Sequence, residues 1–205
     1  MTLNGIDNKN DTKIIYFLLT HSGSLLGEMI KKFTKVPYSH VSIGFQPDLN
    51  SVYSFGRKYV SNPLIGTFVK EELDGKFFEK FPNTKYSLYA MEITNLEFEK
   101  LKIGLKWFEG NRKNFKYNFL GLFTAFFGTE WERRDRYFCS QFVATLLELA
   151  EIGIFDKHPS VIRPHDFTEL ETTKFISAGK IKKFDKSEIT EKIIDIFYNK
   201  DTKKD

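Results

Sequence analysis

The sequence has little cysteine: Cys139 is the only one among 205 residues. A single cysteine excludes an intramolecular disulfide framework. The N-terminus, MTLNGIDNKNDTK, lacks the basic start and apolar run of a secretory signal. No apolar stretch approaches the roughly 18 to 20 residues that a membrane-spanning helix needs. These absences predict a cytoplasmic protein without an integral membrane segment, and peripheral contact with lipid stays open.

The chain also lacks a block of charge of one sign. Its 31 Lys and Arg are interspersed with 27 Asp and Glu, and the formal net charge is only +4. Nucleic-acid binding usually shows a basic patch or stripe, so we expect no nucleic-acid partner. Zinc sites use clustered Cys and His, whereas the four histidines here are widely dispersed. We expect no metal and no other cofactor.

What the sequence has in abundance is phenylalanine, with 22 residues. The composition is that of a globular domain. Some segments have continuous apolar runs or alternate apolar and polar residues, as strands do, and in others apolar residues recur at helical spacing. Strands and helices are mixed without a regular βαβ rhythm, which predicts an α+β domain with an antiparallel sheet packed against helices. The expected strands are 14–20, 40–46, 51–56, 64–69 and 85–93, and the expected helices are 23–34, 96–109 and a third from near Cys139 to Gly153.

The chain is expected to have three parts. Residues 1–13 form a flexible N-terminus and residues 14–170 the main domain. Residues 171–205 form a C-terminal extension with a strand at 180–184, a helix near 187–198 and a frayed, charged end.

Cys139 is predicted to lie at the start of a helix. Unpaired backbone N–H groups and the positive end of the helix dipole favour a thiolate there. Among the histidines, His40 stands out because Ser42 and Gly44 share the polar side of its strand and leave it room. A Cys–His pair is an arrangement for nucleophilic catalysis. The spacing alone leaves open that Cys139 is a core thiol and His40 a structural residue.

A resemblance favours the catalytic interpretation. Four ordered segments, 21–45 with SHVSI, 117–123, 136–148 with FCSQFV, and 161–167, resemble the permuted papain-like cysteine hydrolases, the YiiX/YebB-like branch of the NlpC-type superfamily. The resemblance implies a circularly permuted papain-like (NlpC-type) fold over residues 14–170, in which the histidine strand precedes the cysteine helix.

The same resemblance implies roles for three residues. Cys139 is expected to be the nucleophile and His40 the base. The third position, which orients the imidazole from the next strand and is often an acid, is occupied by Ser54. A serine accepts a hydrogen bond from the imidazole but supplies no charge. Asp166 and Glu72 are further carboxylates that nothing in the sequence brings to the site.

Candidate substrate-binding residues lie near Cys139 and His40 in the sequence. Phe123 and Phe126, in the segment YNFLGLFTAFFG (117–128), cover the core or line an apolar groove for an acyl chain. Arg136 is a candidate for receiving a carboxylate or phosphate, or belongs to a solvated charge cluster. The hydroxyl of Tyr38 is a candidate donor to an oxyanion, beside the backbone N–H of Cys139.

Two functions are consistent with these residues. The first is a cysteine hydrolase, an amidase, thiol protease or acyl-ester hydrolase or transferase, that cleaves an amide, ester or thioester bond of a peptide-like or acyl-containing substrate through an acyl-enzyme. The second is a non-catalytic module of the same fold that binds an apolar or peptide ligand.

Overall fold

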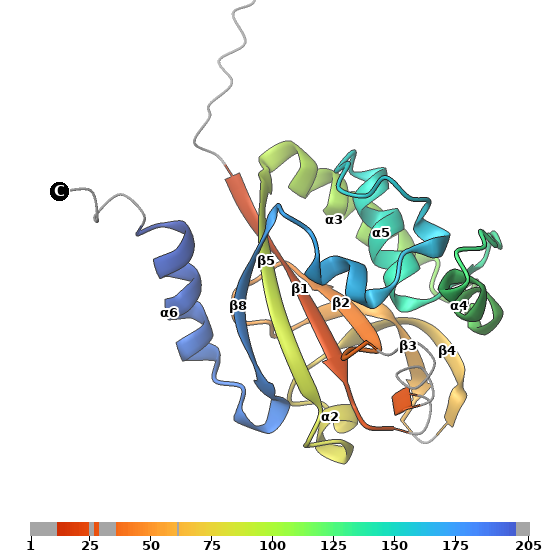
Figure 1. The fold of residues 1–205 in the computed structure, drawn as a ribbon, viewed down its shortest axis with the longest axis horizontal. Helices are drawn as coiled ribbons and strands as arrows, with labels where there is room; N and C mark the ends of the chain where they lie inside the picture. Colours follow the sequence, from red (N-terminus) through yellow and green to blue (C-terminus); the bar gives the residue numbers. More distant parts are fainter. Residues whose placement is uncertain (1–11, 25–26, 29–35, 61, 200–205) are drawn as a thin grey trace, which may run out of the picture.

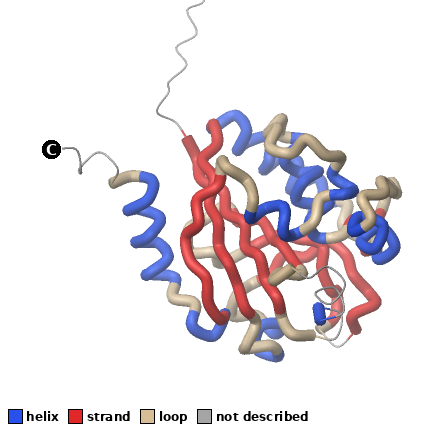
Figure 2. The backbone as a smooth tube through the Cα atoms, viewed as in Figure 1, coloured by secondary structure: helices blue, strands red, loops and turns tan. Residues whose placement is uncertain are grey.

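The structure, a computed structural model, describes residues 12–24, 27–28, 36–60 and 62–199, with all their side chains except those at 63, 64, 123 and 126. Its centre is a six-stranded antiparallel sheet in the order β4-β3-β2-β1-β5-β8 (Figures 1 and 2). The strands are β1 (Thr12–His21), β2 (His40–Gly44), β3 (Val52–Tyr59), β4 (Asn62–Glu71), β5 (Lys85–Thr94) and β8 (Thr173–Lys180).

The helices are α2 (Lys76–Lys80), α3 (Asn95–Gly110), α4 (Phe119–Phe126), α5 (Cys139–Leu149) and α6 (Lys186–Phe197). Short 3-10 turns are η1 (Pro159–Val161), η2 (Pro164–Thr168) and η3 (Ile181–Lys183), and β6 (Lys116–Tyr117) and β7 (Arg136–Tyr137) form a small parallel pair. Within the described residues, no helix has the length and apolar character needed to cross a membrane.

Strand β1 lies inside the sheet, between β2 and β5, and its side chains are buried on both faces. Phe17 and Leu19 lie in the cluster beneath α3 and α5, whereas Leu18 lies in the cluster that α2 and α6 cover. Successive side chains of a strand point to opposite faces, so a continuous apolar run fits a strand with two covered faces. The α+β class and the antiparallel sheet predicted from the sequence are confirmed.

Much of the phenylalanine content lies on the α3–α5 side of the sheet. Phe55 of β3 contacts the rings of Phe68, Phe108, Phe115 and Phe142 at centroid distances from 5.3 to 6.2 Å. Such tilted and edge-on pairs add to the free energy of burial. This ring cluster holds α5 against β2 and β3 and thereby fixes where the helix begins.

Helix α3 confirms the predicted helix 96–109, but its cap differs by one residue. Thr94 rather than Asn95 is the N-cap, because Thr94 and Glu97 form a reciprocal capping box. Most of the predicted helix 23–34 lies outside the described residues, although Gly27 and Glu28 are helical. The five-residue helix α2 was not predicted.

The predicted strand 180–184 is wrong. Strand β8 ends at Lys180, which pairs with Lys85, the first residue of β5, and residues 181–183 turn as η3. The backbone N–H of Ile181 donates to the carbonyl of Thr84, which closes the ladder at this point. The predicted C-terminal helix is present as α6. Because β8 pairs with β5, the C-terminal segment belongs to the main sheet.

Candidate active site

The candidate site lies where β2 and β3 separate. The two strands pair only at Ile43 with Tyr53 and at Gly44 with Val52. Val52 also pairs with Glu71 of β4. Directly paired residues have their side chains on one face, and alternate residues of a strand share that face. Glu71 therefore lies on the same face as His40, two strands away from it.

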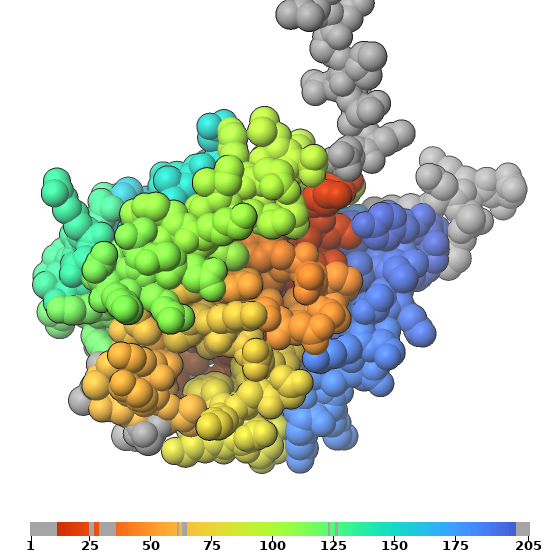
Figure 3. Space-filling view, turned by 180° about the vertical axis from the view of Figure 1, so that it is seen from behind, coloured from red at the N-terminus to blue at the C-terminus, as the bar shows by residue number. Residues whose placement is uncertain are grey.

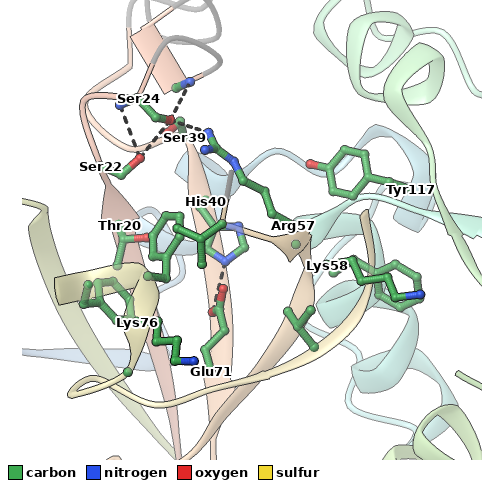
Figure 4. Close-up of a pocket in the computed structure, with 18 of the residues that line it drawn as sticks. Thr20, Ser22, Ser24, Ser39, His40, Arg57, Lys58, Glu71, Lys76 and Tyr117 are labelled. Atoms are coloured by element: carbon green, nitrogen blue, oxygen red, sulfur yellow. Dashed lines mark hydrogen bonds and ion pairs between the residues drawn. The ribbon is translucent and has the colours of Figure 1, made fainter. Parts of the chain in front are cut away.

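A carboxylate holds the imidazole from this position. Glu71 Oε2 lies 3.2 Å from Nε2 of His40 and accepts a 2.6 Å hydrogen bond from the Ser42 hydroxyl. Figure 4 shows the Glu71 side chain reaching up to the ring. The side chains of His40 and Glu71 are 22% and 17% exposed. Nε2 is therefore the ring nitrogen that faces the carboxylate.

Cys139 is the first residue of α5 and reaches His40 from the other side of the sheet. The hydrogen-bonding groups that act on its sulfur are the His40 side chain and the backbone of Val41 and Ser140. Burial raises the pKa of the Cys139 thiol, but the hydrogen bond and charge of His40 and the two backbone bonds outweigh it, so the pKa is lowered.

The pKa of His40 is shifted in the opposite direction from that of Cys139. Burial lowers the pKa of His40, but the charge of Glu71 and the hydrogen bonds to Cys139 and Glu71 raise it to about 10. Burial likewise raises the pKa of Glu71, and the charge and hydrogen bond of His40 lower it below its usual value. These interactions stabilise the charged form of each group: the thiolate, the imidazolium and the carboxylate.

Tyr117 of β6 is the second side chain at the sulfur. It forms hydrogen bonds with the Cys139 side chain and backbone, and its pKa is raised, first by burial and then by the charge of Cys139. The Tyr117 ring lies against Gly66 of β4, where a Cβ would be only 2.7 Å from the Cβ of Tyr117. The absence of a side chain at Gly66 thus makes room for this ring.

His40, Glu71 and Tyr117 line one cavity of about 380 Å³. Figure 3 shows a hollow among the orange and yellow segments, which include β3, β4 and α2. Cys139 has no exposed surface and does not line the cavity. The sulfur therefore lies behind His40 and Tyr117 as seen from the cavity.

The role predicted for Ser54 requires a correction. Its buried hydroxyl donates a 2.7 Å hydrogen bond to the carbonyl of Val41, so it joins the backbones of β2 and β3 and does not orient the imidazole. The carboxylate that contacts His40 is Glu71. The sequence placed the orienting residue on the strand after the histidine strand, whereas the pairing of β3 with β4 brings it from one strand further on.

The other predicted residues are placed as follows. Tyr38 packs against the core beneath α5 and does not line the cavity. Arg136, in β7, is also outside the cavity lining, 3.9 Å from Asp135. The side chains of Phe123 and Phe126 lie outside the described set, and Phe119 is the residue of α4 that lines the cavity.

Two carboxylates named from the sequence are also placed. Asp166 forms an ion pair with Arg163 at 2.8 Å, and Glu72 is exposed at the cavity edge. Among the residues that the structure describes, no three His, Cys, Asp or Glu side chains gather as they would to hold a metal ion.

Sequence reasoning missed Glu71, Tyr117 and Arg57, which all line the cavity. The only signal for Glu71 was its place two residues beyond a predicted strand, on the face of Val69. Comparisons with protein-family models, with curated proteins and with solved structures found no match. The geometry of the site is therefore what supports a function.

Proposed function

We propose that the protein is a cysteine hydrolase in which Cys139 is the nucleophile, His40 the general base and acid, and Glu71 the residue that orients and charges His40. One observation carries the proposal: an unbroken chain of contacts joins the Cys139 sulfur, the His40 ring and the Glu71 carboxylate. The histidine strand precedes the cysteine helix in the chain, which supports a circularly permuted papain-like fold. Because a thiolate is readily oxidised, we also propose a reducing, cytoplasmic location.

The reaction follows from this arrangement. The Cys139 thiolate attacks the carbonyl carbon of an amide, ester or thioester, and the carbonyl oxygen gains the negative charge. The backbone N–H of Cys139 and the Tyr117 hydroxyl are the donors closest to that oxyanion. The His40 imidazolium protonates the leaving group as the acyl-enzyme forms. His40 then removes a proton from water, which attacks the acyl-enzyme and releases the acid and the thiolate.

Access to the sulfur is part of the proposal because Cys139 is fully buried. Tyr117 contacts the sulfur and also lines the cavity, and Figure 4 shows its hydroxyl turned toward the side of Ser39 and Arg57. We propose that displacement of the Tyr117 ring admits the substrate carbonyl.

Fluorogenic esters and amides of increasing acyl length test this function. Turnover is expected for the wild type and not for Cys139→Ala or His40→Ala, with folding checked by circular dichroism. Alkylation by iodoacetamide against pH measures the thiol pKa, which is expected to lie below the free value of about 8.5 and to rise toward it in His40→Ala. Turnover that survives both substitutions would refute the proposed site.

A second candidate function is ligand binding without turnover, and the buried sulfur favours it. In that case the cavity holds an apolar or peptide ligand while the sulfur, histidine and carboxylate stabilise the fold. Rapid mixing with an activated ester separates the two functions. A hydrolase releases one equivalent of leaving group and leaves an acyl group on Cys139, whereas a binding module releases none.

A further inference from the structure

Arg57 of β3 is a cation inside the cavity, and no carboxylate of the described residues is paired with it. Its side chain is partly buried, and burial lowers the pKa of its guanidinium. Within the described part of the chain, no Asp or Glu forms an ion pair with it. The undescribed residues inside the domain, 25–26, 29–35 and 61, contain no Asp or Glu.

Two carboxylates near the cavity are already engaged, and a third, Glu72, is exposed at its edge. Glu71 holds His40 and Ser42, and Glu28 accepts from His21 at 2.9 Å. Removing a charge from water is costly unless the charge is paired. A guanidinium kept in this position without a carboxylate is thus suited to a charge that arrives with a ligand.

The surroundings of Arg57 supply the other donors of an anion site. Its Nη2 donates a 2.6 Å hydrogen bond to the Ser24 hydroxyl, and Ser22 donates to the same oxygen at 3.0 Å. Among the hydrogen bonds of the described residues, the Ser24 hydroxyl accepts and does not donate, so its proton is available. Arg57 has five N–H donors and uses one of them here.

The position of Arg57 is fixed by aromatic rings. Its guanidinium carbon lies 5.8 Å from the ring centroids of both Phe77 and Phe81. These cation–π contacts leave the polar edge of the guanidinium free to meet an anion. Figure 4 shows Arg57 between the Ser22–Ser24 cluster and His40, with Tyr117 on the other side.

We infer that Arg57, Ser22 and Ser24 form a subsite for one carboxylate or phosphate group, whose apolar body lies in the same cavity along Phe55, Val69 and Phe119. The part of this inference that names the substrate rests on the proposed function. That substrate is an amphiphilic acyl compound with an anionic group near the bond that is cleaved. The cavity volume of about 380 Å³ lies in the range of small-molecule sites.

The electrostatic link to the reactive cysteine supports this placement. The charge of Arg57 lowers the pKa of Tyr117, against the effect of burial, so the guanidinium lies near Tyr117. Tyr117 in turn contacts Cys139. In this inference the carbonyl attached to the anion lies beside Tyr117, the residue that covers the sulfur. Planar guanidinium groups bind carboxylate and phosphate in a two-pronged geometry that lysine does not reproduce.

Calorimetric titration of the full chain at pH 7 tests the subsite with probes that contain no acyl bond: hexanoate, hexyl phosphate, inorganic phosphate and neutral hexanol. We expect saturable binding of hexanoate or hexyl phosphate, and the tighter of the two identifies the anion class. Arg57→Gln is expected to weaken that binding at least tenfold and to leave hexanol binding unchanged.

Arg112→Gln is the matched control, because it makes the same substitution at an exposed position outside the cavity lining. We expect less than a twofold effect. Equal losses in both variants, or no saturable anion binding, would overturn the inference. Inorganic phosphate binding as tightly as hexyl phosphate would refute the apolar part of it. If Arg57→Gln fails to fold, Arg57→Lys is expected to lower affinity with the charge retained.

The probes cannot be hydrolysed at a carbonyl, so this titration is independent of turnover. Anion binding without esterase or amidase activity would retain the subsite and refute the hydrolase. Turnover without anion binding would retain the hydrolase and refute the subsite.

Discussion

Glu71 Oε2 lies 3.2 Å from Nε2 of His40, although the two residues are separated by 31 positions and by an intervening strand. The contact forms because Gly44, Val52 and Glu71 are in register across β2, β3 and β4. His40 and Glu71 therefore share a face, and the carboxylate reaches diagonally past Ser42. This relationship supplies the negative charge that stabilises an imidazolium next to a thiolate.

Glu71→Gln is expected to raise the thiol pKa and to lower kcat/KM by about 100-fold, in the range of positioned acid–base groups. An amide carries no charge, so the imidazolium loses its main stabilising partner. The pH dependence of iodoacetamide alkylation measures the first effect and ester turnover the second. Glu72→Gln, at the neighbouring exposed position, is expected to change neither. Matching effects in both variants would contradict the assignment of Glu71.

Ser54→Ala is expected to lower the free energy of unfolding by about 1–3 kcal/mol, because it leaves the buried carbonyl of Val41 without its donor. The thiol pKa should stay at its wild-type value, since Ser54 does not contact the imidazole. Urea unfolding and alkylation kinetics measure the two quantities. A rise in thiol pKa comparable to that of Glu71→Gln would show that Ser54 orients His40 after all.

The pKa of His40, raised to about 10, predicts different pH profiles for two reactions of the same sulfur. Alkylation needs only the thiolate, so its rate should not fall as pH rises through 10. Amide hydrolysis also needs the imidazolium proton for the leaving group, so its kcat/KM should fall as pH rises through about 10. A decline in hydrolysis centred near the ordinary histidine value of about 6.5 would contradict the raised pKa.

Gly66→Ala is expected to displace the Tyr117 ring, because a Cβ at this position would lie 2.7 Å from the Tyr117 Cβ. Alkylation of Cys139 should become faster as its cover moves, while ester hydrolysis slows. Tyr117→Phe separates the two effects because it keeps the ring and removes the hydroxyl. We expect Tyr117→Phe to reduce kcat about 100-fold, as loss of an oxyanion donor does, with alkylation little changed. Slower alkylation in Gly66→Ala would contradict a covering role for Tyr117.

Several parts of the fold were predictable because they depend on local pattern. The unbroken run in 14–20 indicated a strand with two covered faces, and β1 has them. The stripe behind Cys139 predicted that this residue opens a helix, and α5 begins there. The strand predicted at 180–184 was misplaced. The pairing of β8 with β5, and not the local pattern, decides that this strand ends at Lys180.

The sequence by itself determined the class of the fold and a cysteine at a helix start, because periodicity and capping act over a few residues. Only the tertiary structure decided that Glu71, not Ser54, contacts His40, and that Tyr117 and Arg57 join them. The reason is strand register: a shift of one residue turns every side chain of a strand to the other face. That register is set by contacts between distant parts of the chain, which the local pattern does not contain.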